Sequence, residues 1–225
     1  LDRFHSWTIT NKLKVNTSKC FVMLFSRSVN FDFPPEYKIG ESSYLEEKKV
    51  MTILGVQVQS NLRWDSQVLQ MVTRASKTIW VLRRMKLLGV DKHTLVEYWK
   101  SEGRVHLEMG CPVWHSSLTV AQGRSLDRCQ RIAMAAIAGY WAPSLTEQLA
   151  ELGLERLASR RDKLCHQFAV ATPYKSCHQD IFTRAATNSV RPGKHSLSFR
   201  EPRARTATYR NSAVPYLTRL LNCKQ

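Results

Sequence analysis

The alternation of apolar and polar residues divides the chain into a short region of predicted strands and a longer region of predicted helices. Apolar side chains recur at helical spacing over residues 1 to about 15. The run 20–26 is short and almost entirely apolar, which is typical of a buried strand. Residues 37–45 predict a small hairpin, and residues 49–58 predict one further strand with Gly55 inside it.

Residues 63–88 form the longest predicted helix, and its sides differ in character. Asn61 and Asp65 are candidate caps at its start, and Gly89 follows its last turn, as glycine often does at a helix end. Five apolar residues at helical spacing form one narrow stripe: Val68, Val72, Ala75, Ile79 and Leu82. Three basic residues occupy a different side: Arg74, Lys77 and Arg84. We therefore expect a helix that packs on one side and presents positive charge on another.

Two predicted helices follow, and the second repeats this two-sided pattern. Asp91 caps a helix that runs to about residue 108, and Gly103 is expected to weaken or break it, because glycine costs about 1 kcal/mol relative to alanine in a helix. The next helix, 119–137, has an inner stripe of Leu126, Cys129, Ala133 and Ile137. Its opposite side carries a second basic ridge: Arg124, Arg128 and Arg131.

Two more helices are predicted before the pattern weakens. Ser144 caps a short one that Gly153 ends, and residues 155–171 form the other. The inward positions of this last helix are expected to be Leu157, Leu164 and Phe168. Arg161 lies on the same apolar side, where a guanidinium must either reach the protein edge or find hydrogen-bond acceptors.

The C-terminal part is basic and weakly patterned. From residue 175 onward the composition favours loop or disorder, except for an apolar run at 214–221 that is expected to pack back onto the protein. From Arg184 to the end there are nine basic residues and one acid, Glu201. The whole chain has a net charge of +16 and a pI near 9.9, which indicates a polyanionic partner, with nucleic acid favoured over a merely solvated surface.

Composition also bounds the compartment. The chain is 43% hydrophobic, which is enough for a core, but it contains no apolar run of about 18 residues that could cross a membrane. It opens with Leu1 and lacks the apolar segment of a signal peptide, so we expect a truncated start. None of the six cysteines forms a CxxC pair, which favours free thiols in a reducing compartment: intracellular, nuclear or cytoplasmic, and not secreted.

The sequence has no common catalytic motif. It lacks a GxxxxGK[ST] phosphate loop, a GxSxG nucleophile elbow and an HExxH zinc motif. The pairs Cys165–His166 and Cys177–His178 do not fit the usual zinc spacings, so free thiols are favoured over a metal site. Three aspartates stand at predicted helix starts or in loops, where capping or solvation is the expected role: Asp2, Asp32 and Asp65.

Two tryptophans are candidates for base stacking, because aromatic rings among basic residues can stack on bases. Trp80 lies between the apolar and basic sides of the 63–88 helix, where core packing is the favoured role. Trp114 precedes His115 in a predicted loop, where exposure and burial are equally expected.

An ordered set of segments carries a family resemblance. The segments are WTITNKLKVNTSKC at 7–20, ILGV at 53–56, NLRWDSQV at 61–68, ASKTIWVLRRM at 75–85, CPVWHSSLT at 111–119, LDRCQRIAMAAIAG at 126–139, ELGLERLASRRDKLC at 151–165 and VPYLTRLLN at 214–222. In this order they resemble the reverse transcriptases of non-LTR (LINE-type) retrotransposons, above all those of the animal jockey and CR1/L2-type elements. The resemblance covers essentially the whole chain.

The resemblance implies a fragment of an RNA-directed DNA polymerase. In that family the palm carries the catalytic aspartates that bind Mg²⁺, and its Asp-Asp turn lies just upstream of the segment that residues 1–16 resemble. No such turn occurs in this sequence, so the chain is expected to start after it and to be non-catalytic alone, because it cannot place two metal ions. No cofactor is expected in this chain, and Mg²⁺ and the missing upstream region would belong to the complete polymerase.

The expected fold is α+β. A small antiparallel strand and hairpin remnant of a palm would precede a mainly helical thumb and C-terminal region, with a poorly ordered basic tail. The expected divisions are 1–60 for the end of the palm with the primer-grip turn, 61–139 for the helical thumb, 140–173 for a C-terminal helical region and 174–225 for a basic, largely irregular tail.

The resemblance also implies roles for single residues. Lys19 stands where the family has a basic residue near the phosphates of the incoming nucleotide. Leu54 and Gly55 resemble the primer-grip turn, where a bare backbone can approach the primer end. The 63–88 helix would be the first thumb helix, so its ridge of Arg74, Lys77 and Arg84 would contact the phosphates of an RNA, RNA–DNA or DNA template–primer. The ridge of Arg124, Arg128 and Arg131 is expected to add further contacts.

Three other interpretations compete with this one. The chain could be a non-catalytic nucleic-acid-binding protein derived from an element, which needs no polymerase partner. It could be a basic protein-interaction module that binds an acidic protein. It could also be the product of a decayed element copy without a stable fold.

Overall fold

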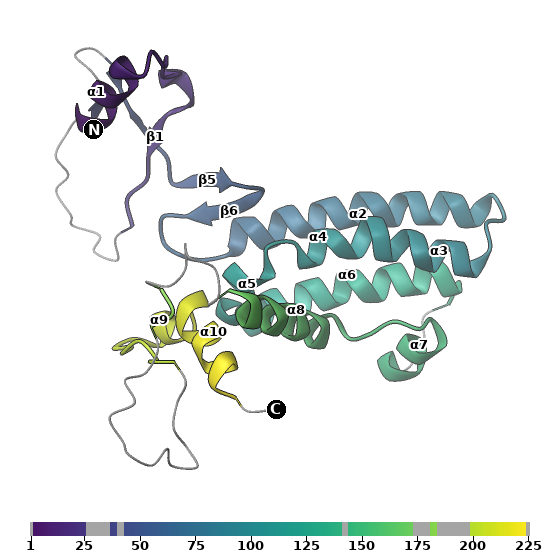
Figure 1. The fold of residues 1–225 in the computed structure, drawn as a ribbon. Coiled ribbons are helices and arrows are strands. Elements are labelled where there is room, and N and C mark those ends of the chain that lie inside the picture. Colours follow the sequence, from purple (N-terminus) through teal and green to yellow (C-terminus); the bar gives the residue numbers. More distant parts are fainter. Residues whose placement is uncertain are drawn as a thin grey trace, which may run out of the picture. The chain divides into compact units, whose positions relative to one another are not determined.

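The computed structural model describes residues 2–25, 37–39, 43–140, 144–172, 181–183 and 199–223 (Figure 1). It is a mixed fold in which helices predominate over small strand pairs, as expected for the α+β class. The chain divides into two compact units, Leu1–Gln67 and Val68–Gln225. The finer boundaries at 139/140 and 173/174 stay predictions. Within the described ranges, we find no helix with the length and apolar character that crossing a bilayer requires.

The first unit opens with a helix and a short parallel strand pair. α1 spans Asp2–Thr10 and so ends before the predicted residue 15, and a 3₁₀ turn follows at Thr17–Lys19. β1, Phe21–Val22, pairs in parallel with β4, Glu46–Glu47. The apolar run 20–26 therefore contributes a strand of only two residues, and these are half-buried rather than fully buried.

A small hairpin follows where the sequence predicts it. β2, Lys38–Ile39, and β3, Ser43–Tyr44, pair in antiparallel register, which confirms the hairpin expected at 37–45. Ile39 is buried, and the Lys38 ammonium lies 4.4 Å from the centroid of the Tyr44 ring.

The single strand predicted at 49–58 is wrong. The structure has a second hairpin here, in which β5, Val50–Ile53, pairs in antiparallel register with β6, Val56–Gln59. Leu54 and Gly55 form its two-residue turn, with φ values of 49° and 86°. Positive φ at both positions suits the right-handed twist of a hairpin, and it is unusual for a leucine because of its Cβ.

α2, Asp65–Leu87, is the longest described helix, and the division between the two units falls within it. Its first turn is held to β6 by two glutamine side chains. The Gln67 Oε1 accepts a hydrogen bond from the Gln57 backbone N–H at 2.7 Å. The Gln59 Oε1 accepts one from the Ser66 N–H at 2.9 Å. The hairpin and the start of α2 are therefore joined by side chain to backbone bonds that period counting does not reveal.

The predicted apolar side of α2 is packed. Four members of the predicted stripe are buried: Val68, Ala75, Ile79 and Leu82. Met71 is buried with them, whereas Val72 is only half-buried. Near the other end, Lys86 donates a hydrogen bond to the Ile137 carbonyl, and Gly89 follows the helix with a φ of 81°. The stripe and the stop are both where the sequence predicts them.

The predicted helix 91–108 is continuous but changes its winding in the middle. α3, Lys92–Tyr98, is capped by Asp91, whose side chain accepts from the Thr94 N–H at 3.0 Å. A π-helical turn, Trp99–Gly103, leads directly into α4, Arg104–Glu108. Such turns insert one extra residue into a helix. The weak point predicted near Gly103 is therefore a change of winding and not a break.

The packing of Trp99 explains why a glycine, a poor helix former, stands at position 103. A Cβ built on Gly103 would lie 2.0 Å from the Trp99 ring, and Trp99 is fully buried. A glycine at this position leaves the space that the indole occupies.

α5, Cys111–Trp114, and a 3₁₀ turn, His115–Ser117, precede α6, Val120–Ala138. Thr119 and Gln122 form a reciprocal capping box at the start of α6. The whole predicted inner stripe of α6 is buried: Leu126, Cys129, Ala133 and Ile137.

α7, Leu145–Glu151, and α8, Leu157–Ala171, match the last two predicted helices, and Ser144 caps α7 as expected. α8 contacts α5, α6 and α10 within the second unit. Leu157 is buried as predicted. The prediction that Phe168 faces inward is wrong, because 43% of that residue is exposed.

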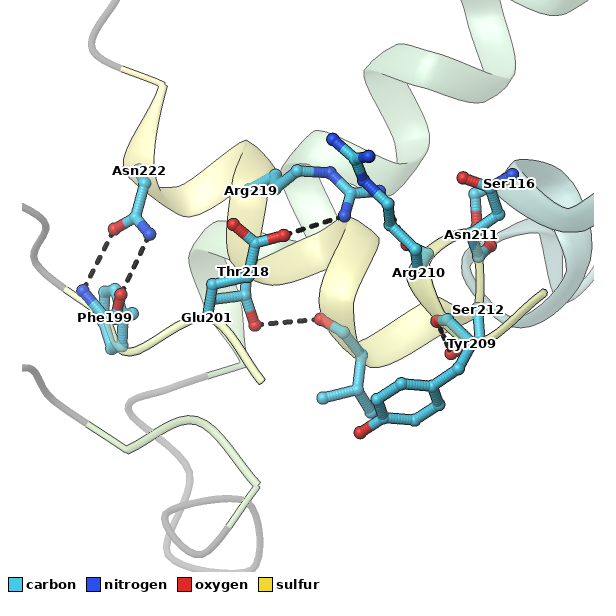
Figure 2. A network of polar contacts seen from close by, with 11 residues as sticks. Ser116, Phe199, Glu201, Tyr209, Arg210, Asn211, Ser212, Thr218, Arg219 and Asn222 are labelled. Atoms are coloured by element: carbon cyan, nitrogen blue, oxygen red, sulfur yellow. Dashed lines mark hydrogen bonds and ion pairs between the residues drawn. The ribbon is translucent and has the colours of Figure 1, made fainter. Parts of the chain in front are cut away.

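The C-terminal segment is partly helical. Of the stretch 174–225, expected to be largely irregular, the structure describes 181–183 and 199–223. Here α9, Ala207–Arg210, and α10, Ala213–Asn222, are helices, and α10 packs against α5 and α8, so the apolar run at 214–221 does dock. Figure 2 shows the polar contacts within this segment. The side-chain amide of Asn222 accepts a hydrogen bond from the Phe199 N–H and donates one to the Phe199 carbonyl. Arg219 forms an ion pair with Glu201 at 2.9 Å.

Candidate nucleic-acid interface

The outer side of α2 presents cations to solvent. Lys77 and Arg84 are exposed, and Arg74 is half-buried at the border of the packed side. Lys77 and Arg84 are seven residues apart and so lie nearly in line along the helix. Arg83, which is not part of the predicted ridge, is exposed beside them. Within the described ranges we find no acidic partner for any of these four side chains, and Asp65 in the first turn is the one carboxylate of α2.

Trp80 lies among these cations, and the core packing predicted for it is wrong. The residue is 61% exposed. The Arg84 guanidinium carbon lies 5.3 Å from the centroid of its ring, which is within the range of a cation–π contact. Lys77, Arg83 and Arg84 are its neighbours at helical spacing. The outer side of α2 therefore combines an exposed aromatic ring with exposed positive charge.

The second predicted ridge, on α6, is only partly available. Arg124 and Arg128 are exposed one turn apart, on the side opposite the buried stripe. Arg131 is half-buried and already engaged with a partner. This ridge therefore presents two guanidinium groups, where three were expected.

The remaining predicted residues belong to the first unit. Lys19 is exposed at the end of the 3₁₀ turn Thr17–Lys19. Leu54 stands at the tip of the β5–β6 hairpin with 97% of its surface exposed, and Gly55 beside it is half-buried. The predicted site thus consists of one set of residues in the first unit and another, on α2 and α6, in the second.

A buried polar cluster in the second unit was not predicted as a cluster. Arg161 is only 2% exposed, and its Nε donates to the His115 Nδ1 at 3.2 Å. Because Nδ1 accepts, the His115 proton is assigned to Nε2, which donates to the Asp162 Oδ1 at 2.9 Å. The Tyr216 hydroxyl donates to the same oxygen at 3.0 Å. Arg161 has therefore found an acceptor and does not reach the protein edge.

The electrostatics of this cluster follow from its burial. Burial lowers the pKa of Arg161 and, more than any other cause, the pKa of His115. The hydrogen bond to Asp162 acts in the opposite direction on the pKa of His115. The cluster ties α8 to the turn after α5 and to α10, so its arrangement serves to hold helices together. The one sequence signal for it was Arg161 on an apolar helix side.

Trp114 belongs to this buried region and not to an exposed loop. It is fully buried, and its indole N–H donates to the Met109 carbonyl at 3.0 Å. The Arg161 guanidinium carbon lies 5.8 Å from its ring centroid. Of the two tryptophans considered for stacking, the structure exposes Trp80 and buries Trp114.

The described cysteines are free thiols. Cys111 and Cys165 are buried with their sulfur atoms 4.0 Å apart, and Cys165 is the donor of that contact. This bond lowers the pKa of Cys111 and raises that of Cys165. No group of three or more His, Cys, Asp or Glu side chains suited to a metal ion occurs in the described part of the chain. The pair Cys177–His178 lies outside the described residues.

Many carboxylates of the second unit are engaged in internal ion pairs. Glu108 is the most buried of these and accepts from Arg160 at 2.7 Å, with Arg104 at 3.4 Å. Other pairs join Lys92 to Glu151, Lys100 to Glu97, Lys163 to Glu155 and Arg219 to Glu201. These acids are therefore paired with neighbouring cations, whereas Lys77, Arg83 and Arg84 on α2 have no acidic partner in the described ranges.

Comparisons of the chain with protein-family models, with curated proteins and with solved structures found no match. The functional interpretation therefore rests on the residues and their geometry.

Proposed function

We propose that this chain is the C-terminal part of the reverse transcriptase of a non-LTR retrotransposon and that it holds template–primer nucleic acid. The binding proposal rests on the exposed cations on the outer side of α2. Lys77, Arg83 and Arg84 are exposed there, and Arg74 borders them, without an acidic partner in the described ranges. The ordered resemblance of the sequence segments supports the assignment to this family.

The spacing of these cations suits a phosphate backbone. Lys77 and Arg84 are separated by about 10 Å along the helix axis, at about 1.5 Å per residue. One strand of a B-form duplex advances about 3.4 Å per phosphate, so the two side chains span about three nucleotides. Contacts of this kind position a nucleic acid without reading its sequence. Binding is therefore expected to tolerate any sequence and to weaken as salt is added.

Under this proposal the chain binds the template–primer and supplies no catalytic residue to the polymerase reaction. The catalytic aspartates and the Mg²⁺ that they bind would come from an upstream polymerase region. α2 would be the first thumb helix and would lie along the template–primer. The hairpin turn at Leu54 and Gly55 would approach the primer end, and Lys19 would lie near the phosphates of the incoming nucleotide.

Charge reversal on α2 tests the proposal. The full chain and the variant R74E/K77E/R84E are titrated against a labelled RNA–DNA duplex at low and at physiological salt, with fluorescence anisotropy as the readout. The variant is expected to bind at least about 10-fold more weakly at low salt, and the slope of log K against log salt is expected to decrease by about 0.9 for each lost contact.

A matched variant separates the α2 side from net charge alone. R203E/R205E/R210E makes the same change in charge at three exposed arginines of the C-terminal segment. It is expected to retain most of the affinity. Equal losses in the two variants, or wild-type binding by R74E/K77E/R84E, would show that α2 is not the interface.

A further inference from the structure

We infer that Trp80 is a stacking platform for an unpaired base, so that the outer side of α2 takes single-stranded RNA or DNA. This inference rests on the proposed function and narrows its substrate class. Trp80 lies in the C-terminal half of α2, the longest described helix (Figure 1), and 61% of its surface is exposed. Its indole offers a large, flat π-face to solvent, and the cations around it distinguish this ring from the other exposed apolar side chains.

The neighbours of Trp80 argue against a helical protein partner. An amphipathic helix that docks on α2 would need further apolar residues three and four positions from the ring. Those positions hold Ser76, Lys77, Arg83 and Arg84, all of them exposed. Leu87 and Leu69, both exposed, lie on the same side as Trp80 but about two and about three turns away along the helix. The immediate neighbours of the ring are therefore a serine and three cations, which favour an anionic ligand over an apolar helix.

That combination matches the chemistry of an unpaired nucleotide. A base offers a flat π-face for the indole, and its two flanking phosphates are attracted to cations on either side. Arg84 lies 5.3 Å from the ring centroid, so one cation is already placed at the edge of the platform, and Lys77 stands one turn before it. Stacking tolerates every base, because each has a π-face, and so agrees with sequence-tolerant holding.

A continuous duplex does not offer this contact. Its bases are already stacked on one another, and a side chain that approaches from outside meets phosphates and groove edges. Trp80 should therefore add affinity for unpaired template or for a strand beyond the primer end, while Arg74, Lys77 and Arg84 act on single strand and duplex alike. The two contributions differ in kind, since one depends on salt and the other does not.

The experiment compares a short labelled RNA strand with the duplex that it forms with its complement, using the full chain. Trp80→Ala is expected to weaken binding of the single strand by about 5- to 150-fold, the range for loss of one stacked base. Duplex affinity is expected to change by less than about twofold, and the salt slope should stay as in the wild type because no charge is removed. Trp80→Phe should retain most of the single-strand affinity.

Leu69→Ala is the matched control, because Leu69 is 68% exposed on the same helix but stands about three turns before Trp80. It is expected to bind both nucleic acids like the wild type. Far-UV dichroism checks that each variant is folded, and Trp80→Gln, which removes the ring but keeps a longer side chain, provides a second test should the alanine variant fail to fold.

Several results would overturn the inference. Unchanged single-strand binding by W80A and W80Q would do so, as would equal losses for strand and duplex or a changed salt slope. Binding of polyglutamate with the same dependence on Trp80 would instead point to an acidic protein. If R74E/K77E/R84E weakens binding and W80A does not, the proposed function stands and the stacking role fails. If the wild-type chain binds no nucleic acid, the proposed function itself fails.

Discussion

Two helical glycines should respond in opposite ways to the same substitution. Gly103 lies in the π-helical turn Trp99–Gly103, where an added Cβ would lie 2.0 Å from one carbon of the Trp99 ring and 2.2 Å from the next. Gly123 lies inside α6, and an added Cβ there would have nothing within 4 Å. Helix propensity alone predicts that alanine stabilises both positions, by up to about 1 kcal/mol each.

The contact with Trp99 reverses the sign at Gly103. The ring would have to move by more than about 1 Å to reach an ordinary carbon–carbon separation of about 3.5 Å. Trp99 is fully buried, so its surroundings would have to shift with it. Overpacking of this kind typically costs about 1–3 kcal/mol, and expelling the ring altogether would cost about 3–5 kcal/mol. After a gain of up to about 1 kcal/mol in helix propensity, overpacking would leave Gly103→Ala destabilised by up to about 2 kcal/mol, and expulsion of the ring would leave about 2–4 kcal/mol.

Urea denaturation followed by far-UV dichroism measures both effects. Gly123→Ala should move the midpoint to higher urea by the equivalent of about 0.5–1 kcal/mol, whereas Gly103→Ala should move it to lower urea. A Gly103→Ala variant as stable as the wild type, or more stable, would show that Trp99 does not occupy the space beside this glycine. A Gly123→Ala variant that is destabilised would show that α6 is packed on that side.

Two further predictions concern His115 and Leu54. Burial first, and then the charge of Arg161, lower the pKa of His115, so the unfolded chain binds a proton more readily than the folded one. The contribution of neutral His115 to the free energy of unfolding is therefore present above about pH 6.5 and is lost as the pH falls below it. In urea melts at several pH values, His115→Gln should lack this part of the pH dependence of stability. Identical pH profiles for the wild type and the variant would contradict the reasoning. Leu54→Asn should raise the free energy of unfolding by about 1 kcal/mol, because asparagine tolerates positive φ better and the side chain, 97% exposed, has little packing to lose. The same melts test it, and a lower midpoint for L54N would contradict the turn geometry.

The sequence by itself determined the long helices and their ends. The buried stripes of α2 and α6 follow from apolar residues at helical spacing, and the caps at Asp91 and Ser144 bind N–H groups only three residues away. These features depend on neighbours within one or two turns, so a single sequence contains the information that they need. The basic ridge of α2 is of the same kind, because the stripe places it on another side of the helix.

Tertiary structure decided the residues at the borders of these patterns. Trp80 stands at the edge of the apolar stripe, and the core packing predicted for it is wrong; Trp114, for which exposure and burial were equally expected, is buried. Whether a border position is buried depends on which other element packs there. Arg161 lies on an apolar helix side and donates to His115, which is distant along the chain. The sequence therefore indicated that Arg161 requires a hydrogen-bond acceptor but could not identify which residue provides it.

Backbone geometry decided the rest. Residues 49–58 contain enough β-forming side chains for one strand, but a turn at Leu54 and Gly55 folds them into two, and leucine is not a residue that signals positive φ. Gly103 looks like a weak helix position until the Trp99 ring is seen in the space that a Cβ would fill. Local periodicity thus determined which segments are helical, whereas contacts between residues distant in sequence, and the space around each one, determined which side chains face solvent.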